Sequence, residues 1–330
     1  MKFKFYYASF IACFLVLDGF AQKKQNVYFL KNDGREVKLK DSADFIRIVQ
    51  EPDSGSVLYN VLEYYKNGKP KLVGKSSTVD PIKLEGMMLS YYSNTKRKRV
   101  ANYNKGKISG VVYDYYPNGK LYRSMDYQSS VQGVEGTGGA PNFMAGENIQ
   151  NVYDSTGVEI VKDGNGHYPI FDNDYKYVEE EGDVKNGKRN GLWKGTLNKS
   201  KIFFTEEYAD GKFIKGTNTD ESGNTKNYTV KEALPTFKGG ERAFGNYLSQ
   251  NIRYPPGARD RNAQGRVILG FVIEKDGSIK DIKILQTVDP ELDAEAVRVI
   301  RESPPWNPGI QHGVPVRVAY TMPINFTLGR

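Results

Sequence analysis

Residues 316–328 read VRVAYTMPINFTL, with an apolar side chain at every even position. Such alternation is typical of a β-strand with one buried side and one solvent-facing side. The segment contains Pro323, and Pro315 precedes it at the same parity. Because proline has no N–H for a ladder hydrogen bond, we expect an edge strand with both prolines on the side without a neighbour. Three residues of that parity would expose their backbone groups there: Arg317, Ala319 and Thr321.

The residues before this strand predict a small α+β domain. Residues 239–248 have helical apolar spacing, whereas residues 266–274 and 279–286 alternate and are joined by a turn at Asp276-Gly277. Asp289-Pro290 has the features of a helix start. We interpret Tyr254-Pro255-Pro256 as non-helical. The expected order is helix, hairpin, helix and edge strand, which gives a three-stranded antiparallel sheet and two helices.

Several short motifs of this region occur in a characteristic order. They are Tyr254-Pro255, Gly265, Phe271, Asp276-Gly277-Ser278, Leu292-Asp293, Pro305-Trp306, Pro308-Gly309 and Pro315-Val316. The ordered set resembles the C-terminal domain of TonB-type energy transducers, over about the last third of the chain. The resemblance implies a periplasmic domain whose last strand pairs with the TonB box, a short segment of TonB-dependent outer-membrane transporters. It also implies that the Tyr-Pro motif lies close to the bound transporter. The partner-binding residues on this interpretation are Tyr254, Pro255, Arg317, Ala319 and Thr321.

Residues 1–21 have the features of a cleavable secretory signal peptide. Lys2 and Lys4 precede an apolar run over residues 5–17, and small residues at Gly19 and Ala21 suit cleavage before Gln22. The run is shorter than the roughly 20 residues that span a bilayer. An uncleaved inner-membrane anchor and a lipoprotein signal remain as alternatives. TonB-type transducers usually have an uncleaved anchor helix and a proline-rich spacer. Neither is evident here, so the sequence does not support a link to the inner-membrane motor.

A turn motif recurs between residues 22 and 230. It reads YYKNGK at residues 64–69, YYSNTK at 91–96 and YYPNGK at 115–120, with weaker copies at 184–188 and 208–212. Asn-Gly favours a tight turn with positive φ, and single hairpins are marginal in water, so the copies must stack. These units resemble MORN-type repeats. We therefore expect a signal peptide (1–21), a β-rich region of MORN-like β-hairpins (22–230) and a TonB C-terminal-like domain (231–330).

Composition and motifs point away from catalysis. The single cysteine, Cys13, would leave with the signal peptide, and His167 and His312 lack metal-ligand spacing. The glycine-rich residues 133–146 lack the context of a phosphate loop, and residues 163–167 are better explained as a turn than as a calcium loop. We expect no enzyme activity, no metal and no cofactor.

Two functions follow from these observations. The first is an exported TonB-like protein of the periplasm or cell envelope of a Gram-negative bacterium, which binds the TonB box by strand addition and is linked to energised transport. The alternative is a passive periplasmic scaffold or cell-envelope binding protein without energy coupling. The formal net charge of +8 permits association with cell-wall polymer. For an exported chain we expect no nucleic-acid partner.

Overall fold

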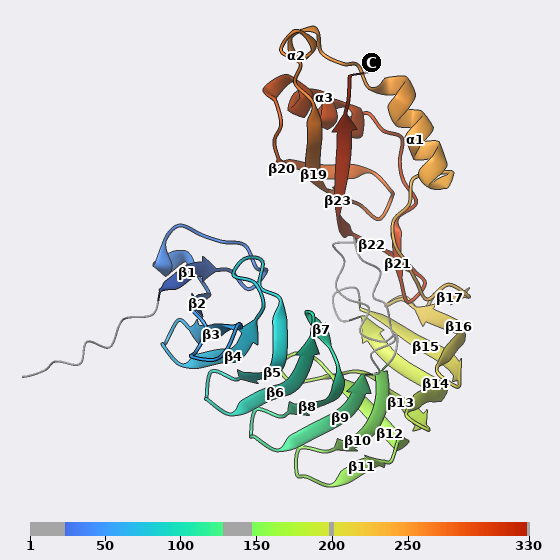
Figure 1. The fold of residues 1–330 in the computed structure, drawn as a ribbon. Helices are drawn as coiled ribbons and strands as arrows, with labels where there is room; N and C mark the ends of the chain where they lie inside the picture. Colours follow the sequence, from blue (N-terminus) through green and yellow to red (C-terminus); the bar gives the residue numbers. More distant parts are fainter. Residues whose placement is uncertain (1–23, 128–146, 198–200, 329–330) are drawn as a thin grey trace, which may run out of the picture.

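The computed structural model describes residues 24–127, 147–197 and 201–328 (Figure 1). The signal peptide predicted at residues 1–21 and the glycine-rich segment 133–146 lie outside these residues. The described chain forms a long, curved antiparallel sheet followed by a small α+β domain (Figure 1). Within the described residues, no helix is both long enough and apolar enough to cross a membrane.

Seventeen strands make up the first sheet, and consecutive strands pair antiparallel along the chain, except that β6 pairs with both β7 and β8. A short 3-10 helix, Lys40–Ser42, lies between β1 and β2. The first nine strands are β1 Gln25–Leu30, β2 Phe45–Gln50, β3 Tyr59–Tyr65, β4 Pro70–Ser76, β5 Leu84–Tyr91, β6 Arg97–Asn104, β7 Lys107–Ile108, β8 Gly110–Tyr115 and β9 Leu121–Tyr127. The others are β10 Glu147–Tyr153, β11 Glu159–Lys162, β12 Asn165–Phe171, β13 Val178–Lys185, β14 Lys188–Leu197, β15 Ile202–Ala209, β16 Lys212–Thr219 and β17 Thr225–Tyr228.

The recurring motif forms the turns between strands, as its sequence predicts. In the copy at residues 115–120, the N–H of Gly119 donates to the carbonyl of Tyr116 at 2.8 Å, and the N–H of Tyr116 donates to the carbonyl of Lys120 at 2.9 Å. Gly119 has a φ of 91°, which a residue without Cβ adopts at little cost. Together these features make a tight turn with a bulge, a common hairpin connection.

The second tyrosine of each motif joins one turn to the next. The hydroxyl of Tyr65 donates to the carbonyl of Tyr91 at 2.6 Å, and the hydroxyl of Tyr92 donates to the carbonyl of Tyr115 at 2.6 Å. The hydroxyl of Tyr116 continues the series to the carbonyl of Tyr153 at 2.9 Å. We call these three bonds the tyrosine ladder. They explain how single hairpins, each marginal alone, stack into one sheet.

Buried carboxylates lie between cations of neighbouring strands at two places in the sheet. Glu63 is 2% exposed and accepts hydrogen bonds from Arg47 at 2.7 Å and Lys71 at 2.5 Å. Asp114 is 5% exposed and accepts from Arg99 at 2.6 Å and Arg123 at 2.9 Å. Two cations on each carboxylate offset the desolvation that burial imposes on a charge. These two groups, called the ionic triads below, stand directly before the Tyr-Tyr pairs of their turns.

The C-terminal domain contains three helices and a three-stranded sheet. The sheet has the order β20 (Ile279–Gln286), β19 (Gly265–Ile273), β23 (Val318–Phe326). The helices are α1 Gly240–Asn251, α2 Pro256–Asp260 and α3 Pro290–Arg301. The side chain of Asp289 caps α3 by accepting from the N–H of Glu291 at 2.9 Å. The three-stranded antiparallel sheet confirms the prediction.

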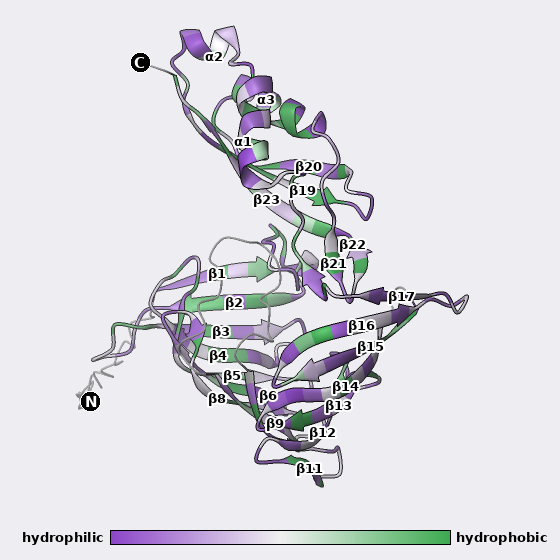
Figure 2. Ribbon diagram, turned by 90° about the vertical axis from the view of Figure 1, so that its right-hand side faces the viewer, coloured by the Kyte–Doolittle hydropathy of each residue, from purple (hydrophilic) through white to green (hydrophobic). Residues whose placement is uncertain are grey.

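Two sequence predictions for this domain were wrong. Pro256 begins the short helix α2, because proline fits the first helical position, so the domain has three helices and not two. The strand predicted over residues 316–328 is broken at Arg317 and ends at Phe326. Residues before the break form β22 (Val314–Val316), which belongs to a second small sheet of order β18 (Glu232–Ala233), β21 (Gly309–Gln311), β22. We call this second sheet the neck, because it lies between the curved sheet and the C-terminal domain (Figures 1 and 2).

Trp306 anchors the core of the C-terminal domain. It is 2% exposed, and its ring lies 5.6 Å from Phe237, 5.9 Å from Phe271 and 5.6 Å from Tyr320, measured between centroids. Its Nε1 donates to Ser303 Oγ at 3.1 Å, so the polar end of the indole is satisfied. Trp306 is therefore part of the core and is not exposed to a ligand.

Candidate functional site: the open edge of strand β23

Strand β23 lies at the edge of its sheet. It pairs with β19 over nine residue pairs without a bulge, from Gly265 opposite Phe326 to Ile273 opposite Val318. Among the described residues, β19 is its only partner, because β20 pairs with the other side of β19. Figure 1 shows β23 lying across the front of the domain, with β19 and β20 behind and beside it.

The register determines which backbone groups of β23 face away from β19. Pro323 lies opposite Ile268, and since proline cannot donate, this pair is one of the non-hydrogen-bonded pairs of the ladder. Pairs alternate along an antiparallel ladder, so Thr321 and Ala319 also belong to non-hydrogen-bonded pairs. By this register their N–H and C=O groups point to the open side.

The side chains of β23 alternate as the sequence predicts. Ile324 and Phe326 are 1% and 2% exposed and belong to the core. Four residues of the other parity are exposed: Ala319, Thr321, Pro323 and Asn325. Tyr320 and Met322 are only half-buried. Both pack against the core, as the alternation predicts, and their exposed part makes them further candidates for contact with a bound strand.

Arg317 differs from Ala319 and Thr321. It stands between β22 and β23, and its guanidinium donates to Glu274 at 2.8 Å and to Asp281 at 2.5 Å. These hydrogen bonds raise the pKa of Arg317 above its usual range. The side chain therefore reaches across the sheet to the β19–β20 hairpin, and Arg317 marks the beginning of the open edge without forming part of the strand.

Tyr254 and Pro255 lie near the opposite end of β23. The ring of Tyr254 packs edge-on against Phe326, with centroids 6.0 Å apart, and its hydroxyl donates to the carbonyl of Ala263. Pro255 is the residue that precedes α2. The five predicted residues therefore do not form one compact cluster: Arg317 stands before β23, Ala319 and Thr321 lie along it, and Tyr254-Pro255 lies near its last residue.

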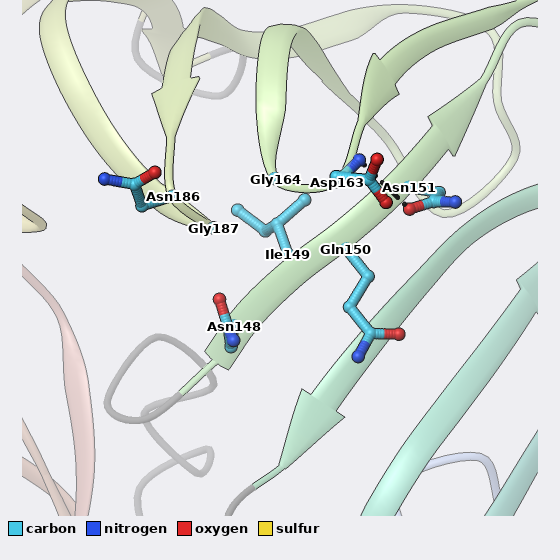
Figure 3. A pocket seen from close by; sticks show the side chains of 8 residues that line it. All are labelled: Asn148, Ile149, Gln150, Asn151, Asp163, Gly164, Asn186 and Gly187. Carbon is cyan, nitrogen blue, oxygen red and sulfur yellow. Dashed lines mark hydrogen bonds between the residues drawn. The ribbon is translucent and has the colours of Figure 1, made fainter.

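A separate hollow of about 530 Å³ lies between turns of the curved sheet (Figure 3). Its lining is mostly amide side chains and glycine backbone, with the side chains of Asp163 and Ile149 in addition. The N–H of Gly187 already bonds to the carbonyl of Gly164 at 2.9 Å, and the N–H of Gly164 to the carbonyl of Gln150 at 2.7 Å. Within the described part of the chain, no group of three or more His, Cys, Asp or Glu side chains is arranged to hold a metal. The hollow offers no nucleophile or acid–base pair, so we do not place the function there.

Comparison with known proteins identifies the C-terminal domain. Residues 250–328 match the family model described as "Gram-negative bacterial TonB protein C-terminal". A similar solved structure is the NMR solution structure of Helicobacter pylori TonB-CTD (residues 179-285), which is 28% identical, covers 26% of this chain and 78% of that chain, and has a TM-score of 0.21. No curated protein matches the chain. The family match confirms the resemblance for residues 250–328, whereas the MORN-like character of the repeats stays a prediction.

The matched family is a transport-related, non-enzymatic domain family, which is consistent with the prediction that the chain is not an enzyme. It suggests a TonB-like function for the C-terminal domain. The partner-binding residues and the domain boundaries stay predictions.

Proposed function

We propose that this chain is an exported TonB-like protein whose C-terminal domain binds the TonB box of outer-membrane transporters by strand addition to β23. The observation that supports this most directly is the free edge of β23 within a domain that matches the TonB C-terminal family. On this proposal the bound strand contacts the backbone of Ala319 and Thr321. Tyr254 and Pro255 lie near one end of it.

Strand addition depends mainly on backbone hydrogen bonds. A partner strand beside β23 can accept from the N–H groups of Ala319, Thr321 and Asn325, whereas Pro323 leaves a gap in the row of donors. Each such bond contributes about 1 kcal/mol net, so affinity accumulates over several bonds and depends little on the side chains of these residues. The half-buried Tyr320 and Met322 would add apolar contacts on the opposite side of the pleat.

The proposed location is the periplasm or cell envelope, after export by the signal peptide. There the domain would take part in energised transport, and the MORN-like repeats would space it from a surface. The alternative is a passive scaffold held on cell-wall polymer, an association that the basic net charge of the chain permits because such polymers are anionic.

Binding to a transporter peptide tests the first function. The chain from Gln22 to Arg330 is titrated with a synthetic TonB-box peptide while the amide signals of Ala319, Thr321 and Asn325 are followed by NMR. Strand addition predicts large shifts at these amides and protection from hydrogen exchange. Saturable binding to purified cell-wall polymer, with no shift at β23 upon peptide addition, would favour the scaffold.

A further inference from the structure

The tip of the neck enters the last strands of the curved sheet. The hairpin formed by β21 and β22 turns at His312 and Gly313, which have φ values of 48° and 70°. His312 is 3% exposed although it stands at the tip of a two-residue turn, a position that is normally solvated. Its burial comes from residues of β15 and β16, more than ninety positions earlier in the chain.

Three contacts hold His312: one at a ring nitrogen, one at the ring face and one at the backbone carbonyl. Its Nδ1 lies 2.7 Å from Glu206 Oε1, and its ring stacks on Phe204 with centroids 3.8 Å apart and planes 20° from parallel. The carbonyl of the same residue accepts from Asn218 Nδ2 at 3.1 Å. A loop in superficial contact with the sheet would not form contacts through its ring face, its ring nitrogen and its backbone at the same time.

Glu206 is the centre of this contact and has no exposed surface. Besides His312, it accepts from the hydroxyls of Tyr208 at 2.6 Å and Tyr228 at 2.7 Å, and Lys231 Nζ lies 3.3 Å away. A buried carboxylate needs such a set of donors to offset its loss of hydration. If one donor is missing, part of the desolvation cost is left without compensation. Of these four groups, His312 belongs to the neck, the two tyrosines belong to the curved sheet, and Lys231 stands between β17 and β18, so the set is complete only when the hairpin is seated.

Gly313 shows how closely the hairpin fits. A Cβ added to it would lie 2.3 Å from the ring of Tyr228, a distance that no side chain tolerates. Its N–H donates to the carbonyl of Lys231 at 3.2 Å. The hairpin tip therefore fills its site with both backbone and side chain.

We propose that the His312-Gly313 tip is a plug that fixes the orientation of the C-terminal domain on the curved sheet. β22 is joined to β23 through Arg317 alone, so the plug and the open edge lie on nearly continuous extended chain (Figures 1 and 2). This inference does not depend on what binds at β23.

The experiment compares two glycine variants of the full chain. Gly313 and Gly191 both have a φ of 70°, but a Cβ at Gly191 meets nothing within 4 Å. Gly313→Ala and Gly191→Ala therefore introduce the same backbone strain, and only the first obstructs the plug. Spin labels at Thr205→Cys in the curved sheet and Lys280→Cys in β20, both exposed, report the distance between the two parts by pulsed electron paramagnetic resonance, with Cys13 replaced.

We expect a narrow distance distribution in the parent and in Gly191→Ala. In Gly313→Ala the distribution should be about twice as broad, because the C-terminal domain moves relative to the curved sheet once the plug is displaced. Amide hydrogen exchange of residues 309–316 should rise about tenfold in the same variant. His312→Ala, which leaves the backbone of the turn unchanged, is expected to act in the same direction and replaces Gly313→Ala should the latter fail to fold. A broad distribution in the parent, or equal widths in the parent and the plug variant, overturns the proposal.

Discussion

Pro323 of β23 lies directly opposite Ile268 of β19, in a ladder of nine pairs without a bulge. Because proline cannot donate, this pair shows which residues of β23 face away from β19. The N–H and C=O groups of every second residue, counted from Pro323, point to the open side. The first prediction tests this parity.

Thr321→Pro should leave the domain folded and weaken binding of a TonB-box peptide. The substitution removes an N–H on the open side, where Pro323 shows that the strand accommodates proline. The loss should be about 1–3 kcal/mol of binding free energy, the value of one or two hydrogen bonds. Calorimetric titration measures the affinity, and thermal unfolding checks the fold.

Met322→Pro is the matched control for Thr321→Pro. Its N–H faces β19, so its loss should break the ladder, leave a carbonyl of β19 without a partner and destabilise the domain by about 1–3 kcal/mol. If Thr321→Pro unfolded the domain and Met322→Pro did not, the parity would be opposite and β23 would present different backbone groups.

Turn strain in the repeats can be changed in both directions. Gly119→Val places a β-branched side chain at a φ of 91°, beside Lys96, and should destabilise the curved sheet by about 1–3 kcal/mol. Thr95 occupies the equivalent position of the preceding copy with a φ of 72°, so Thr95→Gly should relieve strain and stabilise by up to about 1 kcal/mol. Chemical denaturation measures both; equal stability of all three proteins would argue against the turn strain.

Trp306→Ala should unfold or nearly unfold the C-terminal domain. Truncation of a buried aromatic costs about 3–5 kcal/mol, a large fraction of the stability of a small domain. Leu285, which is 59% exposed on β20, provides the control, and Leu285→Ala should change the stability by less than about 0.5 kcal/mol. A well-dispersed NMR spectrum of Trp306→Ala, together with a melting temperature equal to that of the parent, would contradict the prediction.

Acid should weaken the contact between the neck and the curved sheet. Burial acts to raise the pKa of Glu206, but the hydrogen bond with His312 and the charge of Lys231 outweigh it and lower this pKa from 4.5 to about 2. The hydroxyls of Tyr208 and Tyr228 also face the carboxylate, and Glu180 and Arg189 complete the charged surroundings.

Because the folded-state pKa of Glu206 lies below the unfolded value, the unfolded chain binds more protons between these two values. The stability that the ionised carboxylate contributes is therefore present above pH 4.5 and is lost as the pH falls towards 2. The difference corresponds to roughly 3 kcal/mol. Glu206→Gln should flatten the dependence of unfolding free energy on pH in this window, whereas Glu241→Gln on the exposed part of α1 should not. An unchanged slope in Glu206→Gln would assign the acid sensitivity to other carboxylates.

Local patterns in the sequence predicted the strands and turns that are formed by residues close together in the sequence. Alternation over residues 316–328 predicted the edge strand and its buried parity, and Asp276-Gly277 predicted the β19–β20 turn, where Gly277 has a φ of 84°. The same alternation concealed the break at Arg317. Apolar residues continue on both sides of it, so periodicity alone could not show that the chain leaves the neck and enters a different sheet.

Contacts between distant residues had no comparable signal. His312 and Glu206 are 106 positions apart, and neither stands in a motif that indicates a partner. The hydroxyl bonds of the tyrosine ladder were also missed, although the Tyr-Tyr pairs themselves were evident; the second tyrosine reaches the next turn only because the strands curl. Within the candidate site, the sequence predicted Ala319 and Thr321 from parity, whereas the separation of Arg317 from Tyr254 needed the fold.

The two ionic triads suggest how this architecture can change in length. Glu63 and Asp114 occupy equivalent places before their Tyr-Tyr pairs, at positions 63 and 114, with a third turn between them that has Ser90 instead of a carboxylate. Over these three turns, charged and neutral turns therefore alternate. A gene duplication spanning two neighbouring turns would reproduce this alternation, so that each added Tyr-Tyr pair would meet a turn of the same kind as in the present sheet. Evolution could thus lengthen or shorten the curved sheet by whole pairs and alter the reach of the C-terminal domain, without redesign of either end.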